Sequence, residues 1–393
     1  MKYTIIALCE PQCLAFEHAP FNAALLYMVS LAYPSAKIVF YGETTHIECV
    51  RDVLKNRQNM DRIAFYPIRI PKRKSKDLMR LPMELTLCQH VLSKTSENMQ
   101  ALVFCSVTNT GLLALKGLMK LRQINVPTVA FLHGCLSDID GRQPRRPWKW
   151  ILGLKRILSF PSPPSLRLIA LGDSILKHVK KALPKLEWQW RSMEHVYLWP
   201  KIKTKSLHWQ IQVHQPIKFG FLGVSNKGFD TFVKLADDVS RYTGKAKFMM
   251  AGFYKGPAAL KPVSRYISDI PGMPLSRKDF ELRLNQLTYV VWTAKPDHYR
   301  LTASGTFLDA MAFLKPGIYL RNDYIAHYFD KMGDIGYLCD TFEEMVGLIN
   351  DLIADFPAAR YQRQIQNIEI GRRIFEPDAL SPRFKNIITS CEA

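Results

Sequence analysis

The stretch YRLTASGTFLDAMAFLKPGIYL, from Tyr299 to Leu320, carries the clearest structural signal of the sequence. Residues 305–313 have the apolar spacing of a short helix, and the Leu-Lys-Pro-Gly run at 314–317 ends that helix before a strand begins. Thr302 or Ser304 can cap the helix, whose first backbone N–H groups and positive dipole end then face outward. The stretch is therefore either a capped core helix followed by a buried strand, or an anion site suited to a diphosphate.

Upstream of this stretch, the first half of the chain alternates short apolar runs with helical patterns. Strands are expected at 3–8, 36–41, 63–70, 101–106, 126–132, 166–171 and 196–198. Helices are expected at 21–33, 45–56, 76–94, 111–122 and 174–182. Short buried strands that alternate with helices are typical of a parallel, doubly wound sheet.

After an irregular segment the same alternation begins again. Strands are expected at 217–222, 246–251, 289–292 and 318–320, and helices at 228–242, 277–286, 305–313, 342–355 and 359–370. The sequence thus predicts an α/β protein with two Rossmann-like, doubly wound domains facing a cleft. The expected divisions are a first Rossmann-like domain at 1–204, a linker at 205–216, a second Rossmann-like domain at 217–375, and a tail or helix at 376–393 that is free to pack back on the first domain.

Composition and charge narrow the class of protein. The 393 residues are 48% hydrophobic and 22% charged, as in a globular chain with two cores. Residues 1–200 contain 28 Lys and Arg against 14 Asp and Glu, so most of the net charge of +20 lies in the first half. Membrane lipid, nucleic acid and a phosphorylated substrate are the candidate partners of this basic half.

The cysteine pattern and the first apolar run of the sequence indicate the cellular compartment. Eight cysteines are scattered without a CxxC pair, and neither a second pair nor a histidine cluster accompanies Cys9 and Cys13. This pattern indicates free thiols in a reducing compartment rather than disulfides or a zinc site. The first apolar run is closed early by Glu10 and Pro11, too soon for a signal peptide, so we expect a cytoplasmic protein.

A phosphate-binding pattern follows the first strand of the second half. In FLGVSNKGFDTF, residues 221–232, Lys227 lies in the loop at the start of a helix, between Gly223 and Gly228. A lysine there neutralises a phosphate, and the glycines allow the backbone to approach it. The alternative is an ordinary strand-to-helix turn with a solvated lysine. Arg300, just before the helix start at 305, is expected to add a second positive charge for the same diphosphate.

Two polar stretches follow strands of the first half. His133 ends the strand in FLHGCLSDID (131–140), while Glu17 and His18 precede a helix in FEHAPFNAALL (16–25). Each is a candidate base for an acceptor hydroxyl. The alternative to a catalytic role is structural: His133 would only form a hydrogen bond with nearby backbone, and Glu17 and His18 would only cap the helix. Asp138 and Asp140 have the spacing of a metal motif but lie in a loop, so no metal site is expected.

A basic, tryptophan-containing segment, RQPRRPWKWILGLKRILSF, spans residues 142–160. Its apolar residues recur at helical spacing beside positive charges, as in a helix that lies on an anionic membrane. An ordinary amphipathic helix on the domain surface is the alternative. The residues predicted to face the membrane are Arg145, Arg146, Trp148, Lys149, Trp150, Lys155 and Arg156.

Together these motifs resemble the GT-B glycosyltransferases, in particular the large retaining group 1 type, and a divergent branch from bacterial surface-polysaccharide clusters. The resemblance covers Gly223, Lys227 and Gly228, the strand at 248–253, and LDAMAFLKPGIYL at 308–320, which is similar to the second half of the EGFGxxxLEAMAxGKPVI element. The departures are Leu301 in place of the first glutamate, Val224 in place of an arginine, and Leu314 in place of the glycine of Gly-Lys-Pro.

The resemblance implies a nucleotide-diphosphate sugar as donor, bound without a metal or separate cofactor. It places the donor at Gly223, Lys227, Gly228, Tyr299, Arg300, Thr302, Ser304, Gly305 and Asp309, the last at the position of a ribose-binding glutamate. His133, Glu17 and His18 would serve a lipid-linked saccharide acceptor at the inner face of the cytoplasmic membrane. The alternatives are an inactive GT-B scaffold, suggested by Leu301, and a basic nucleic-acid-binding protein, against which the absence of any nucleic-acid module argues.

Overall fold

The computed structural model describes residues 4–58, 60–71, 77–94, 98–139, 151–200, 216–240, 244–257 and 266–391. The chain divides into two compact units, a first unit of Met1–Leu198, Leu301–Ala303 and Ile374–Ala393 and a second unit of Trp199–Arg300 and Ser304–Arg373. The first boundary therefore falls after Leu198, ahead of the expected linker, most of which lies outside the described residues.

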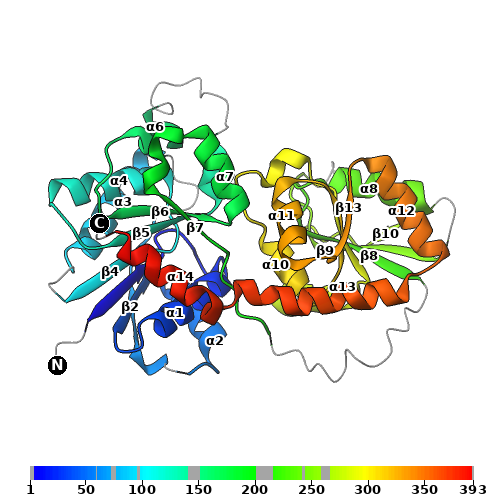
Figure 1. Ribbon diagram of the computed structural model, residues 1–393, viewed down its shortest axis with the longest axis horizontal. Helices are drawn as coiled ribbons and strands as arrows, with labels where there is room; N and C mark the ends of the chain where they lie inside the picture. Colours follow the sequence, from blue (N-terminus) through cyan, green and yellow to red (C-terminus); the bar gives the residue numbers. More distant parts are fainter. Residues whose placement is uncertain are drawn as a thin grey trace. The chain divides into compact units, whose positions relative to one another are not determined.

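The first unit is built on a sheet of parallel strands in the order β3-β2-β1-β4-β5-β6-β7 (Figure 1). The strands are β1 (Ile5–Cys9), β2 (Lys37–Gly42), β3 (Ile63–Pro67), β4 (Met99–Phe104), β5 (Thr128–Leu132), β6 (Leu166–Leu171) and β7 (Trp190–Met193). The prediction of a strand at 196–198 was wrong, because these residues form no strand. The last strand is instead the edge segment WRSM, in which Trp190, Ser192 and Met193 are buried; its short length and the polar Arg191 and Ser192 hide it in the sequence.

The helices of the first unit pack on this sheet. They are α1 (Ala19–Ala32), α2 (Thr44–Leu54), α3 (Asp77–Leu92), α4 (Asn109–Leu121), α6 (Leu154–Ser159), α7 (Asp173–Ala182) and α14 (Pro377–Thr389), with 3-10 turns η1 (Met60–Arg62), η2 (Gly134–Ile139) and η3 (Pro184–Gln189). The C-terminal helix α14 packs against α1 and adds Leu380, Phe384 and Ile387 to the first core. Helix α1 is apolar on nearly every side because α14, α2 and the sheet all cover it.

The second unit repeats the design with the strand order β10-β9-β8-β11-β12-β13, again all parallel. Its strands are β8 (Ile217–Val224), β9 (Ala246–Phe253), β10 (Ile267–Ser268), β11 (Tyr289–Trp292), β12 (Gly317–Leu320) and β13 (Gly336–Cys339). Its helices are α8 (Phe229–Ser240), α9 (Arg277–Gln286), α10 (Gly305–Ala312), α11 (Asp323–Met332), α12 (Phe342–Ala354) and α13 (Ala358–Gly371), with 3-10 turns η6 (Pro296–Tyr299) and η7 (Arg372–Phe375), the latter crossing the unit boundary.

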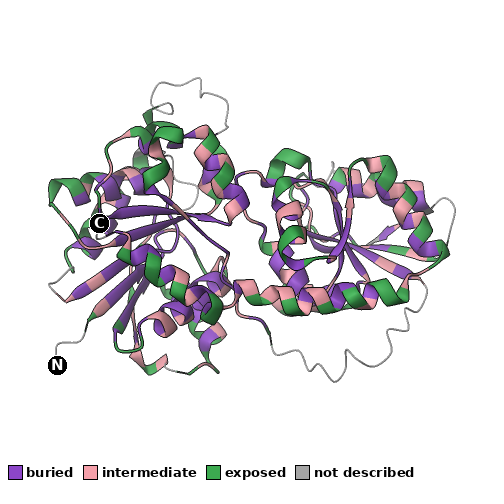
Figure 2. Ribbon diagram, in the orientation of Figure 1, coloured by how far each residue is buried: buried purple, intermediate pink, exposed green. Residues whose placement is uncertain are grey.

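The topology fixes where each unit can bind a ligand. In both sheets the strand order reverses beside the first strand, between β1 and β4 and between β8 and β11. Ligands of open α/β sheets bind at the carboxyl ends of the strands next to such a reversal. Figure 2 shows the buried strands and the exposed outer faces of the helices. In the part of the chain that the structure describes, no helix is both long and apolar enough to cross a membrane.

Candidate functional site

In the second unit, the loop after β8 is fixed by close backbone packing. Gly223 and Gly228 have positive φ angles of 91° and 97°. A Cβ on Gly228 would lie 2.4 Å from the carbonyl oxygen of Thr293, just after β11, so this position requires glycine. The Thr293 hydroxyl donates to the Gly228 carbonyl at 2.6 Å. Gly228 therefore holds the loop against the neighbouring strand.

Lys227 lies in this loop at the reversal of strand order. Its Nζ is 5.6 Å from the ring centroid of Tyr299, in η6 after β11. Burial lowers the pKa of Lys227. Partial desolvation and the charge of Lys227 also lower the pKa of His298, which the sequence analysis missed although it lies in the loop after a strand. A bound anion would relieve both groups, because each is penalised for its positive charge.

The N-terminus of α10 lies beside the same loop. Ser304 is its N-cap and is fully buried; its Oγ accepts from the Phe307 N–H at 3.2 Å, and its own N–H donates to the Tyr324 hydroxyl at 3.2 Å. Ser304 thus shapes the helix start, whereas the next N–H groups, of Gly305 and Thr306, have no partner within the helix. A Cβ on Gly223 would lie 2.9 Å from Thr306 Cγ2, so loop and helix start are adjacent.

The other predicted donor residues divide into different roles. Tyr299 is only 1% exposed and stacks on Tyr324 at 5.8 Å, so its ring packs beneath Lys227 rather than facing a ligand. Arg300 ends η6 and is half-buried. Leu301 and Thr302 are grouped with the first unit, whereas Arg300 and Ser304 on either side of them are grouped with the second.

Asp309, predicted to bind ribose, is held by an arginine that the sequence analysis missed. Arg277 Nη1 lies 2.9 Å from Asp309 Oδ1, and its Nε donates to Glu281 Oε1 at 2.6 Å. The Asp309 side chain is 17% exposed, so the carboxylate remains open on one side. No local pattern predicts the pair, because Arg277 comes from α9.

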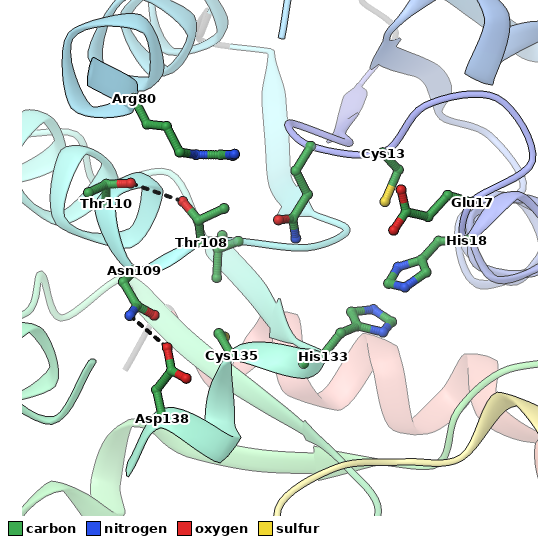
Figure 3. A pocket seen from close by; sticks show the side chains of 13 residues that line it. Cys13, Glu17, His18, Arg80, Thr108, Asn109, Thr110, His133, Cys135 and Asp138 are labelled. Atoms are coloured by element: carbon green, nitrogen blue, oxygen red, sulfur yellow. Dashed lines mark hydrogen bonds between the residues drawn. The ribbon is translucent and has the colours of Figure 1, made fainter. Parts of the chain in front are cut away.

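In the first unit, a cavity of about 420 Å³ opens at the carboxyl ends of β1, β4 and β5 (Figure 3). It brings together Glu17, His18 and His133, the three residues predicted to serve the acceptor. The cavity is lined by Gln12, Cys13, Glu17, His18, Arg80, Val107, Thr108, Asn109, Thr110, His133, Gly134, Cys135 and Asp138. Their side chains are mostly polar.

His133 lies against other rings in this cavity. Its ring centroid is 4.7 Å from that of His18 and 4.4 Å from that of Phe21. Burial, and then the charges of His18 and His195, lower the pKa of His133 well below its usual value. The neutral ring has Nε2 3.0 Å from the Cys105 carbonyl, which can only accept, so Nε2 carries the proton and Nδ1 the free electron pair.

Two further groups were missed in the sequence. His195 follows β7, and burial, with the charge of His18 second, lowers its pKa to about 4. Glu10, directly after β1, is fully buried and accepts from the Gln12 N–H at 3.1 Å, from Asn22 Nδ2 at 3.0 Å and from the Ser106 hydroxyl. Its place at a strand end is the signal that could have found it.

Part of the predicted membrane-facing stripe is core. Leu154, Ile157 and Leu158 of α6 are fully buried, so the apolar side of 154–159 packs inside the first unit, and the interfacial interpretation was wrong there. Lys155 and Arg156 are exposed. The other predicted membrane-facing residues, Arg145, Arg146, Trp148, Lys149 and Trp150, lie outside the described residues.

No protein-family profile and no curated protein matches the sequence. Solved structures match over nearly the whole chain at low identity. HepE of Anabaena, in complex with UDP and glucose, is 13% identical with a TM-score of 0.62, over 99% of this chain and 100% of that one. The lipopolysaccharide outer core galactosyltransferase WaaB is 11% identical with a TM-score of 0.62, over 98% and 99%.

An α,α-trehalose-phosphate synthase (UDP-forming) of Burkholderia vietnamiensis is 9% identical with a TM-score of 0.63, over 99% of both chains. These likenesses span both units and bear out the predicted architecture. The chain has the GT-B fold, with two parallel, doubly wound α/β units.

Proposed function

We propose that this protein is a glycosyltransferase that moves a sugar from a nucleotide-diphosphate donor to a hydroxyl group. Two similar structures are described as a galactosyltransferase and a UDP-forming synthase, and a third contains UDP. The fold alone does not specify chemistry, so the proposal depends on the residues at the strand ends.

The observation that carries the proposal is the adjacency of the Gly223–Gly228 loop and the start of α10. Lys227 from one side and the Gly305 and Thr306 N–H groups from the other supply a cation and helix-end donors. This combination suits a diphosphate. Lys227 and Arg300 would also stabilise the negative charge that develops on the departing nucleotide, without a metal in the donor site.

On the acceptor side, His133 is the candidate base, because it lines the cavity of the first unit and its neutral ring has an unprotonated Nδ1. Glu17 lines the same cavity and is the second candidate. Either group would accept the hydroxyl proton as the new glycosidic bond forms. We further propose a hexosyl or related donor sugar and a lipid-linked saccharide acceptor, used in bacterial polysaccharide synthesis at an anionic membrane surface, which would suit the basic first half of the chain.

Donor binding is tested by calorimetric titration of the wild type with UDP and GDP, followed by Lys227→Ala and Arg300→Ala. We expect each variant to bind the preferred nucleotide about 10-fold more weakly or worse, since charge-assisted contacts to phosphate contribute about 1.5–3 kcal/mol. Lys234→Ala is the matched control, because Lys234 is an exposed lysine of α8, the helix that follows the same loop. Unchanged affinity in both test variants would remove the assignment.

A catalytically inactive scaffold is the second candidate. Leu301 stands where the related enzymes have a glutamate, and it is buried and grouped with the first unit. A protein that binds UDP or GDP but neither hydrolyses nor transfers any nucleotide sugar, in a screen of donors and lipid-linked acceptors, would favour the scaffold over the enzyme.

A further inference from the structure

A cluster of three different ligand types lies where β1 ends and α1 begins. A carboxylate oxygen of Glu10, the Cys13 sulfur and a ring nitrogen of His18 all lie within 4.8 Å of one another. Glu10 and Cys13 are 0% and 2% exposed. Their spacing is not a known metal pattern. The turn brings them together because Ala15 and His18 both adopt positive φ angles, of 46° and 55°, and fold the segment back on itself.

Two of these groups lack the partner that burial normally requires. His18 Nδ1 is buried, and within the described structure no hydrogen-bond partner reaches it. An unsatisfied buried nitrogen costs about 1–3 kcal/mol. The groups that donate to Glu10 are the Gln12 N–H, the Asn22 amide, the Ser106 hydroxyl and the Cys13 thiol, all neutral, and no lysine or arginine among the described residues forms an ion pair with it. Buried carboxylates are usually paired with a cation or bound to a metal.

The surroundings of the cluster are acidic, although the chain as a whole has a net charge of +20. Glu17 and Asp138 line the adjoining cavity. The one arginine of its lining, Arg80, is already bound to Glu84, whose carboxylate lies 3.0 Å from the guanidinium. A cation at Glu10 would therefore meet net negative charge rather than repulsion.

We propose that Glu10, Cys13 and His18 form a binding site for a divalent metal ion of the zinc class. Sulfur, imidazole and carboxylate together suit Zn²⁺, whereas Mg²⁺ and Ca²⁺ prefer oxygen alone. Cys13 and His18 both line the cavity, so the open fourth position faces it. Three protein ligands with one open position is the arrangement of reactive rather than purely structural zinc sites.

A second layer of contacts holds the ligands in place. Asn22 Nδ2 donates to Glu10 Oε2 at 3.0 Å and lies 2.8 Å from His46 Nε2. His46 Nδ1 lies 2.8 Å from the carbonyl of Ala15, inside the turn that carries Cys13 and His18. Such outer contacts orient metal ligands and tune affinity. The site assigns His18 to metal binding and leaves His133 and Glu17 as the candidate bases.

The test uses cobalt(II) as a spectroscopic probe on the full-length protein after treatment with a chelator. We expect one cobalt ion per chain, a thiolate-to-cobalt absorption band in the near ultraviolet, and displacement by Zn²⁺ but not by Mg²⁺. Cys13→Ser should abolish the thiolate band. Cys135→Ser should keep it, because Cys135 lines the same cavity but lies outside the cluster.

His18→Gln provides a second route, because it leaves the thiolate in place. We expect it to weaken cobalt binding at least about 10-fold, the lower limit seen even for supporting residues of metal sites. Circular dichroism of each metal-free variant verifies that it is folded. The absence of a saturable cobalt signal in the wild type, or an unchanged thiolate band in Cys13→Ser, would overturn the site.

The metal site and the proposed donor site can fail separately. The metal ligands belong to the first unit and the nucleotide contacts to the second. Chelation should therefore remove the cobalt signal and leave UDP or GDP affinity unchanged, whereas Lys227→Ala should do the reverse. Parallel loss of both in either experiment would contradict a site that is independent of the donor.

Discussion

At the scale of single residues, Leu314 shows how the chain departs from its resemblance without changing the fold. It occupies the glycine position of Gly-Lys-Pro and still adopts a left-handed φ of 53°. The Leu314 N–H donates to Met311 O at 3.1 Å and the Lys315 N–H to Ala310 O at 3.0 Å, the two bonds of a Schellman motif after α10. The leucine side chain is only 2% exposed, so its burial offsets the backbone strain.

Replacing Leu314 with glycine separates these two effects. The substitution relieves a left-handed conformation that costs about 1–2 kcal/mol but removes a buried leucine worth about 2–5 kcal/mol. We therefore expect Leu314→Gly to lower the free energy of unfolding by about 1–3 kcal/mol, measured by urea denaturation. A variant as stable as the wild type would indicate that relief of strain fully offsets the lost burial, and a more stable variant would indicate that strain dominates at this position.

The Asp309–Arg277 pair gives a test of the ribose contact. Asp309→Ala should weaken UDP or GDP binding about 10-fold, the loss of one or two hydrogen bonds, while inhibition by inorganic pyrophosphate stays the same because it has no ribose. Arg277→Ala removes its ion pair with Asp309 and should leave nucleotide binding equal or stronger. An equal loss for pyrophosphate and nucleotide would place Asp309 at the phosphates or in the fold instead.

The candidate site could be predicted only in part. Lys227 and His133 were identifiable because they follow apolar strands closely, and Glu17 and His18 because they come just before a helix. Partners that depend on tertiary contacts were missed, among them Arg277 on α9, which pairs with the predicted Asp309. The cluster of Glu10, Cys13 and His18 was missed for another reason. A turn with two left-handed residues creates it, and this turn contains no glycine, the residue that usually indicates left-handed backbone in a sequence.

At the scale of elements, a buried lysine fastens the C-terminal end of α6 to α4. Lys116 Nζ donates to the carbonyl oxygens of Ile157 at 2.8 Å, Leu158 at 3.2 Å and Phe160 at 2.6 Å. The last carbonyls of a helix have no partner inside it, and a cation near them also complements the helix dipole. Burial nevertheless lowers the pKa of Lys116 to about 8.

This depressed pKa predicts a pH-dependent stability. The unfolded lysine keeps a pKa of about 10.4, so between about pH 8 and 10.4 the unfolded chain binds the extra proton and folding is favoured as pH rises. We expect the unfolding free energy of the wild type minus that of Lys116→Met to increase by about 2 kcal/mol from about pH 7.5 to 9.5. Chemical denaturation at both pH values measures this difference, and a pH-independent value would rule out the titration.

Elements were predictable where burial imposes a strong pattern. The strands at 166–171 and 289–292 have the predicted bounds because all their residues are buried. The helix at 277–286 also has its predicted bounds, although it buries only Leu284; its start is fixed by the N-cap Ser276, which accepts from the Asp279 N–H. The short strands β10 and β13 were missed, and so was the ten-residue helix α11, although Tyr324, Ile325 and Tyr328 are buried in it. The two-residue β10 lies at a sheet edge, where little side-chain burial is required and the local pattern is weak.

At the scale of the whole molecule, the fold does not explain why most of the net positive charge lies in the first half of the sequence. The first 200 residues carry 28 basic against 14 acidic residues. The apolar side of α6 is used in the core, so the exposed Lys155 and Arg156 can contribute to a membrane surface by charge but not by inserting that side. Electrostatic attraction to anionic lipid is then the mechanism to test for this part of the chain.

Reversing those two charges tests membrane attraction directly. Each basic residue near an anionic bilayer contributes about 1 kcal/mol, so Lys155→Glu with Arg156→Glu should weaken co-sedimentation with phosphatidylglycerol vesicles at least about 10-fold at low salt. Lys247→Glu with Lys278→Glu makes the same change in net charge at exposed positions of the second unit and should have a smaller effect. Equal losses in both double variants would mean that net charge alone attracts the protein. No loss in the first would exclude α6 from the membrane surface.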